Sequence, residues 1–156
     1  MSNKISLYLD DVRTPLTDKW EVVRSYDEFV SHIRLNGLAN YDMISFDHDL
    51  GDTSIKEYYN NVLPNYSLDY DNILEKTGMD CVKWLVNHYY ANFKEEVSRP
   101  SGIKKTEGIT FPKVYTHSAN PIGSANIMGY ANNFFRNERQ PQTCIRIEIN
   151  HTRIDQ

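Results

Sequence analysis

Three short apolar runs of this chain each end in a cluster of polar and ionisable residues. The clusters stand in the sequences LYLDD (residues 7–11), ISFDHDLG (residues 44–51) and VYTHSANP (residues 114–121). Removing a carboxylate from water is costly unless it is paired or binds a cation, so such clusters have no place in a packed core. Ligands of parallel sheets bind beyond the carboxyl ends of the strands. The three clusters therefore predict one site at one edge of a sheet.

The order of expected elements fits such a sheet. Apolar runs predict strands over residues 4–9, 20–23, 43–46, 113–116 and 144–149. Helical spacing predicts helices over 26–35, after Thr77, and over 121–135, with Ser25, Thr77 and Asn120 as N-caps. Strands that are separated by helices indicate an α/β fold with a mostly parallel sheet. We expect a single domain over 1–156, with an insertion at about 52–76 that forms either a loop or short irregular helices.

Composition excludes several classes of function. The chain has no run of about 18 apolar residues, so we expect no membrane-spanning helix and no membrane partner. A net charge of −4 argues against binding duplex DNA through its phosphates. The two cysteines, Cys81 and Cys144, are far apart and form no metal or redox motif. We expect both to be reduced core residues of a cytoplasmic protein.

The first cluster places the carboxylates of Asp10 and Asp11 close to the positively charged side chain of Arg13. Asp10 and Asp11 are suited to coordinating a hard divalent metal through oxygen. The alternative is a solvated turn in which they accept hydrogen bonds from nearby backbone amides. Arg13 could hold a phosphate oxygen, or it could neutralise the two aspartates.

The second cluster is Asp47-His48-Asp49. An extended backbone would point the two aspartates to one side and His48 to the other. One carboxylate could then join Asp10 and Asp11 around a metal, while His48 faces the substrate or supports another acid. The alternative is a turn capped by one aspartate, with Gly51 supplying a positive φ, but a turn does not require all three polar residues.

The third cluster combines His117 and Ser118 with a helix start. Asn120 is a good N-cap and Pro121 suits the first helical position. The backbone amides around Gly123 would then form an anion site, beside which a histidine is well placed for acid–base catalysis on a phosphoester. The alternative is a core histidine followed by an ordinary capped helix.

The insertion is rich in tyrosine. These side chains could stack on a nucleobase, but covering the protein's own apolar surface is the stronger expectation. The residues are Tyr58, Tyr59, Tyr66 and Tyr70.

The spacing of these clusters resembles the receiver domains of response regulators. Those domains have an acidic pair after strand one, an aspartate at the end of strand three and a Ser or Thr after strand four. The strand expected at 144–149 lacks the lysine that receivers carry at that place. The DHDLG and HSANPIG motifs, together with LDDVRTP at residues 9–15, more closely resemble the cyclic-phosphate processing receiver domains. The resemblance spans about residues 5–135 and implies a three-layer, flavodoxin-like fold with a mostly parallel sheet.

This resemblance implies a metal-dependent phosphoesterase that acts on a cyclic phosphate, such as a 2′,3′-cyclic RNA end or a cyclic nucleotide. Its partners would be a small phosphorylated nucleotide or an RNA end, and its cofactor Mg²⁺ or Mn²⁺. The expected roles divide the site residues into three sets. The metal ligands are Asp10, Asp11 and one of Asp47 or Asp49; the catalytic residues are Asp47, His48 and His117; the substrate and phosphate contacts are Arg13, Ser118, Asn120, Gly123 and Asn126.

Other functions stay open. Asp47 could be a nucleophile rather than a metal ligand, which would give an aspartyl-phosphate intermediate. The chain could be a signalling receiver that accepts a phosphoryl group, although it lacks the expected lysine. It could also bind phosphorylated nucleotides without turning them over, which would leave the two histidines beside the carboxylates without a role.

Overall fold

The computed structural model describes residues 4–97, 111–138 and 148–149. Its strands are β1 (Ile5–Leu9), β2 (Trp20–Val23), β3 (Tyr41–Phe46), β4 (Lys113–Thr116) and β5 (Glu148–Ile149). Its long helices are α1 (Tyr26–Asn36), α4 (Gly78–Val97) and α5 (Pro121–Glu138). The short helical segments are η1 (Leu38–Asn40), α2 (Asp52–Glu57), η2 (Tyr58–Val62), α3 (Leu63–Asn65) and η3 (Tyr70–Asn72).

The strands form one sheet in the order β2-β1-β3-β4-β5, and every neighbouring pair is parallel. This order is that of flavodoxin-like α/β folds, so the predicted fold class is confirmed. The last strand is described only at 148–149. The rest of the strand expected at 144–149, including Cys144, lies outside the described residues.

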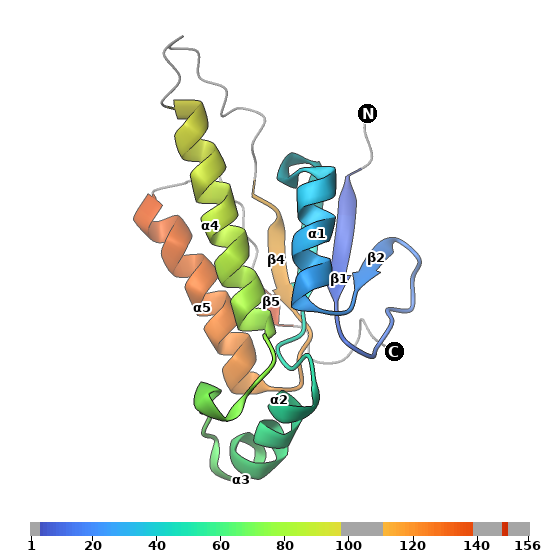
Figure 1. Cartoon of the computed structure of the whole chain (residues 1–156), viewed down its shortest axis with the longest axis vertical. Helices are drawn as coiled ribbons and strands as arrows, with labels where there is room; N and C mark the ends of the chain where they lie inside the picture. Colours follow the sequence, from blue (N-terminus) through green and yellow to red (C-terminus); the bar gives the residue numbers. More distant parts are fainter. Residues whose placement is uncertain (1–3, 98–110, 139–147, 150–156) are drawn as a thin grey trace.

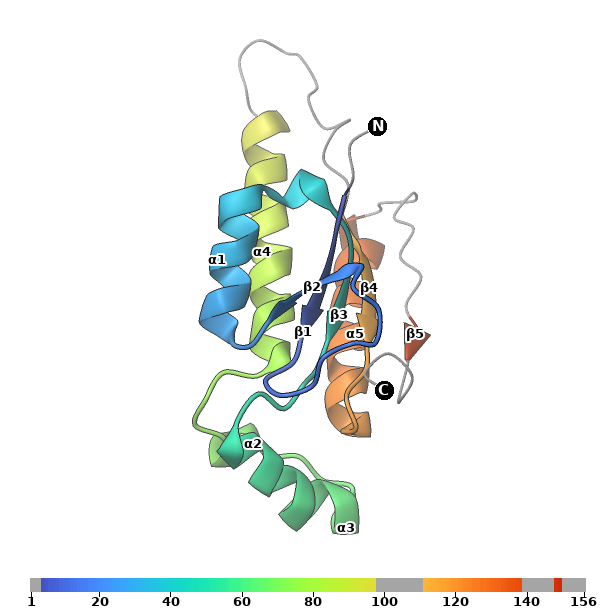
Figure 2. The same cartoon turned by 90° about the vertical axis from the view of Figure 1, so that its right-hand side faces the viewer.

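The strand order also decides where the helices lie. Crossovers between parallel strands are right-handed, and those through α1, α4 and α5 all run in the same direction across the sheet. These helices therefore share one face, on which Figure 2 shows α1 and α4 side by side. Loop 10–19, which connects β1 to β2, crosses the sheet in the opposite direction. Figure 2 shows this loop on the other side of β1, where a three-layer fold would place a helix.

The core lies between the sheet and these helices. Alternate strand residues point to it, so Leu7 and Leu9 of β1 and Phe46 of β3 pack with Phe29 of α1 and Leu85 of α4. The free Cys81 is fully buried in the same cluster, as expected.

All three expected N-caps are present. The Ser25 hydroxyl accepts a hydrogen bond from the Glu28 amide at 3.2 Å. The Thr77 hydroxyl accepts from the Met79 amide at 3.2 Å, and the Asn120 side chain caps α5 in the way described below. The capping chemistry read from the sequence therefore locates the starts of the three long helices.

The insertion folds into short helices rather than a loop. Segments α2, η2 and α3 follow one another from residue 52 to 65 and lie beyond the carboxyl ends of the central strands (Figure 1). Two of its tyrosines, Tyr59 and Tyr66, are 62% and 69% exposed and so do not cover apolar surface as expected, whereas Tyr58 is half-buried. In the part of the chain that the structure describes, no helix combines the length and the apolar character needed to cross a membrane.

Candidate active site

The three polar clusters meet because three strands end at the same level. Leu9 pairs with Phe46, and Phe46 pairs with Thr116, so each cluster begins one residue later. The ladder continues for that residue: the Asp47 amide donates to the Leu9 carbonyl at 2.9 Å, and the His117 amide donates to the Phe46 carbonyl at 3.0 Å. The predicted juxtaposition at one sheet edge follows from this register.

A group of carboxylates lies at this edge. Asp10, Asp11 and Asp47 each present an oxygen within 4.8 Å of the others. Carboxylate oxygens at this spacing are the donor set that Mg²⁺ and Mn²⁺ prefer, and burial strengthens the need for a cation. The residues therefore fit a divalent metal. Asp49, the fourth predicted ligand, is not part of this group among the described residues.

Asp10 is held rigidly in the group. One carboxylate oxygen accepts from the backbone amides of Val12 and Arg13 at 2.9 and 2.7 Å. The other accepts from Nε of Arg13 at 2.9 Å and faces Nε2 of His117 at 3.1 Å. Burial opposes ionisation of this carboxyl, but these hydrogen bonds outweigh it and the pKa of Asp10 is lowered.

The pKa of Asp47 is shifted in the opposite direction to that of Asp10. Its burial and the neighbouring charge of Asp10 raise the pKa of Asp47 well above the ordinary value. Arg13 opposes this shift from 3.5 Å, and Ser118 opposes it through a hydrogen bond. Burial and Asp10 also raise the pKa of Asp11. The edge therefore carries more negative charge than Arg13 neutralises, as a cation site requires.

We expect Asp47→Asn to raise the melting temperature of the protein at neutral pH when divalent ions are chelated. A carboxyl whose pKa is higher in the folded than in the unfolded chain destabilises the fold once it ionises. This destabilisation is absent below the ordinary pKa of 3.8, grows as pH rises towards the folded pKa, and is complete above it. Thermal melts between pH 4 and 8 would measure the difference between the two proteins.

Mg²⁺ or Mn²⁺ should reverse this order, because a cation stabilises only the protein that retains the carboxylate. Asp18→Asn, on the exposed part of loop 10–19, is the matched control and should show neither effect. If Asp47→Asn melts below the wild type in chelator at every pH, the description of Asp47 as a destabilising charge is wrong.

His117 contacts the carboxylate group from the interior of the protein. Its ring is fully buried and stacks on Tyr8, with the ring centroids 4.1 Å apart. Nδ1 lies 2.8 Å from the Ser45 hydroxyl, while Nε2 faces Asp10. Both ring nitrogens are thus engaged inside the protein. The contact with Nε2 positions Asp10, and the catalytic role expected of His117 stays a prediction.

His48 belongs to a second polar group. As the alternation predicts, it points away from Asp47 and lies against α5, so close that a Cβ on Gly123 would come within 2.2 Å of its ring. Nδ1 lies 2.6 Å from the Asp49 carboxylate, which also accepts from the Asn120 side chain at 3.3 Å. Asp49 thus orients His48. Its charge also contributes to the raised pKa values of Asp11 and Asp47.

The second ring nitrogen of His48, Nε2, contacts Tyr70, which the sequence analysis did not assign to the site. Nε2 lies 3.0 Å from the hydroxyl of Tyr70, to which the Asn126 side chain also donates at 3.0 Å. Tyr70 comes from η3 of the insertion, so the insertion contributes to the site. Its tyrosine-rich composition pointed to the segment, but nothing in its pattern distinguished Tyr70 from the other tyrosines.

The start of α5 does not form the predicted phosphate site. The Gly123 amide donates to the Asn120 side chain at 2.9 Å, and the Ser124 amide donates to the Asn120 carbonyl. Asn120 is itself fully buried and committed to the cap and to Asp49. Gly123 therefore serves close packing against His48, and Asn120 serves helix capping and orientation of Asp49.

Arg13 and Ser118 lie at the carboxylates. The Arg13 guanidinium is one-third exposed and contacts Asp10 and Asp47, so neutralisation is what the structure shows, rather than a free phosphate contact. Ser118 is buried, bonds to Asp47 and accepts from the Asn120 amide at 3.1 Å. These two residues adjust the charge and position of Asp47.

Comparison with known proteins agrees with this geometry. A family model described as the cyclic-phosphate processing Receiver domain matches residues 5–133, which include both polar groups and the insertion. No curated protein and no solved structure matches the chain. The match covers most of the sequence. The chain belongs to the cyclic-phosphate processing receiver domain family.

Proposed function

We propose that this protein is a divalent-metal-dependent phosphoesterase that opens a cyclic phosphate, such as the 2′,3′-cyclic end of an RNA. The observation that carries the proposal is the group of three carboxylates within 4.8 Å, at the edge where α/β folds bind ligands. The chain also belongs to a family that is described as cyclic-phosphate processing. We infer that the group of three carboxylates is the site at which this processing takes place.

Asp10, Asp11 and Asp47 would hold Mg²⁺ or Mn²⁺. When bound, such a cation polarises phosphoryl oxygens and lowers the pKa of water. Asp10 already accepts from four donors, and a carboxylate offers about four lone-pair positions. Arg13 is one-third exposed, so its side chain would be the donor that gives way to a cation at Asp10, and its guanidinium would then be placed to bind a phosphoryl oxygen.

The protein's own residues then supply orientation and a proton. His117 keeps Asp10 in place through Nε2. Asp49 holds Nδ1 of the fully buried His48, so Nε2, which contacts the Tyr70 hydroxyl, would be the atom that exchanges a proton with the leaving hydroxyl. The Tyr70 hydroxyl occupies the position beside Nε2 in this structure, so a substrate hydroxyl would either replace it or exchange a proton through it.

The direct test is incubation of the purified protein with 2′,3′-cyclic mononucleotides, cyclic-phosphate-ended RNA and cyclic dinucleotides. Product formation would be followed by ³¹P NMR and chromatography, with Mg²⁺, Mn²⁺ or chelator present. We expect ring opening of at least one 2′,3′-cyclic substrate, abolished by chelator and restored by the metal. Asp47→Ala should abolish turnover, because it removes a ligand of the proposed metal.

Two results would contradict the proposal. One is the absence of turnover on every substrate with either metal, while the protein melts cooperatively. The other is turnover that persists unchanged in Asp47→Ala. Stoichiometric labelling of Asp47 by acetyl phosphate without hydrolysis would indicate a signalling receiver instead.

A further inference from the structure

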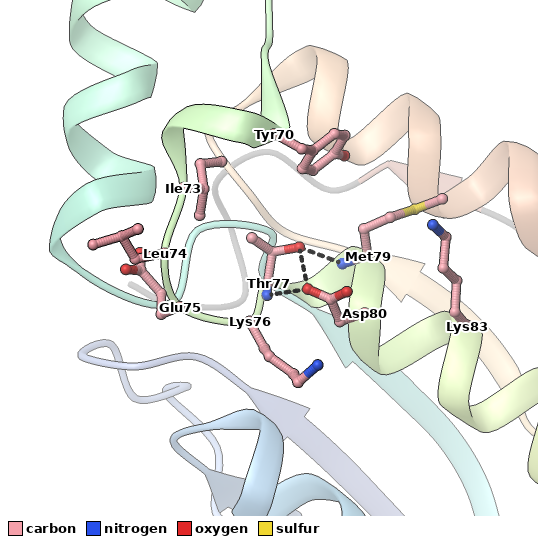
Figure 3. A pocket seen from close by; sticks show the side chains of 9 residues that line it. All are labelled: Tyr70, Ile73, Leu74, Glu75, Lys76, Thr77, Met79, Asp80 and Lys83. Carbon is pink, nitrogen blue, oxygen red and sulfur yellow. Dashed lines mark hydrogen bonds between the residues drawn. The ribbon is translucent and has the colours of Figure 1, made fainter.

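A cleft of about 320 Å³ lies between the insertion and the start of α4 (Figure 3). Its size is at the lower end of the range for small-molecule sites, which is about 300–1,000 Å³. The lining residues come from η3, from the segment that follows it, and from the first turns of α4. They are Tyr70, Ile73, Leu74, Glu75, Lys76, Thr77, Met79, Asp80 and Lys83.

The cleft adjoins the candidate active site at two points. Tyr70 lines the cleft and places its hydroxyl 3.0 Å from Nε2 of His48. Thr77 and Met79, which also line the cleft, flank Gly78, whose amide donates to the His48 carbonyl at 2.9 Å. His48 itself is fully buried, so a molecule in the cleft would approach it at the Tyr70 hydroxyl.

The lining combines an aromatic ring, apolar side chains and two lysines. The acidic side chains are already engaged: Glu75 accepts from the Ser54 amide at 2.7 Å, and Asp80 accepts from the Thr77 amide at 2.8 Å. Lys76 and Lys83 are exposed, and no ion pair to either lysine occurs among the described residues. In this structure their ammonium groups lie over the rings of Tyr26 and Tyr130, at 5.0 and 6.0 Å, and neither ring lines the cleft, so each lysine side chain has to turn to reach a ligand there.

These features suit a nucleotide. A base can stack on the Tyr70 ring, which is partly exposed, and bases stack on tyrosine irrespective of sequence. Met79 and Lys83 are four residues apart on α4, so they share one face of the helix. The Lys83 ammonium would meet the phosphate of a nucleotide, while Met79 beside it would contact the apolar part of the same nucleotide.

We propose that the cleft binds the nucleotide adjacent to the cyclic phosphate, with its base on Tyr70 and its phosphate at Lys83 or Lys76. This inference rests on the proposed function and names the substrate class more narrowly. The protein would act on an RNA end of at least two nucleotides rather than on a free cyclic mononucleotide. The insertion would then supply specificity for a strand.

The test measures binding separately from turnover. Isothermal titration in chelator would compare the dinucleotide UpUp, which ends in a 3′-phosphate, with 3′-UMP. We expect UpUp to bind about tenfold more tightly, because it adds one stacked base and one charged contact. Lys83→Gln combined with Lys76→Gln should weaken UpUp binding by about tenfold and leave 3′-UMP unchanged. Lys56→Gln, on α2 and outside the cleft, is the matched control and should change neither.

The outcomes separate the two proposals. If no cyclic phosphate is opened but UpUp binding depends on the two lysines, the cleft is a nucleotide site and the proposed catalysis fails. If cyclic ends are opened and the lysine variants bind UpUp as well as the wild type does, the proposed catalysis stands and the cleft assignment is wrong. Equal affinity of the wild type for UpUp and 3′-UMP, or no measurable binding of UpUp, would also overturn the cleft assignment.

Discussion

Gly78→Ala is expected to destabilise the protein by about 3 kcal/mol, at the upper end of the usual cost of overpacking. A Cβ at this position would lie 2.0 Å from the carbonyl oxygen of Asp47 and 3.1 Å from the Cα of His48. Backbone cannot move aside as a flexible side chain can, so α4 would have to shift away from the end of β3. Chemical denaturation monitored by circular dichroism would measure the loss.

The chain provides a matched control at Gly129, in the middle of α5. No atom lies within 4 Å of the position that its Cβ would take. Gly129→Ala should therefore stabilise the protein slightly, by about 0.5–1 kcal/mol, through helix propensity. If the two variants had equal stability, the close approach of α4 to Asp47 would not be a feature of the protein in solution.

His48→Gln is expected to reduce turnover of a cyclic phosphate by about 100-fold or more, the usual contribution of general acid–base catalysis. Glutamine retains a polar group near the position of Nε2, but it cannot exchange a proton. Steady-state kinetics between pH 5 and 9 would measure the loss.

His88→Gln is the control for this substitution. His88 lies in α4 with its ring stacked on Trp84, and it contacts none of the site residues described above. It should leave the rate and the pH profile unchanged. A His48→Gln protein that melts like the wild type and turns over cyclic phosphate at the wild-type rate would remove His48 from the mechanism.

Much of the fold follows from local rules that a sequence displays. Strand and helix periods, together with the N-caps Ser25, Thr77 and Asn120, determine the order of elements, and the order determines a parallel sheet. Polar clusters directly after strands then have to meet at one edge. On this basis Asp10 and Asp11 are expected to meet one of the aspartates after β3, and the register of β1, β3 and β4 brings Asp47 to them.

The division of roles inside the site was not predictable in the same way. Asn120 was a candidate both for capping and for substrate binding, and only the packed structure shows that the cap and Asp49 take its side chain. His117 was a candidate both for catalysis and for the core, and the structure shows it fully buried beside Asp10, because alternation at the strand end turns it away from the helices. Tyr70 reaches His48 across 22 residues through the path of the insertion, which no local pattern encodes.

The neighbours Asp47 and His48 serve different polar groups, one at the carboxylates and the other against α5. Each residue reaches its group because the chain changes sides as it leaves β3. Inserting or deleting a single residue between Phe46 and Asp47 would turn both side chains to the wrong face of the sheet and disrupt both groups at once. At this junction the number of residues matters as much as their identity.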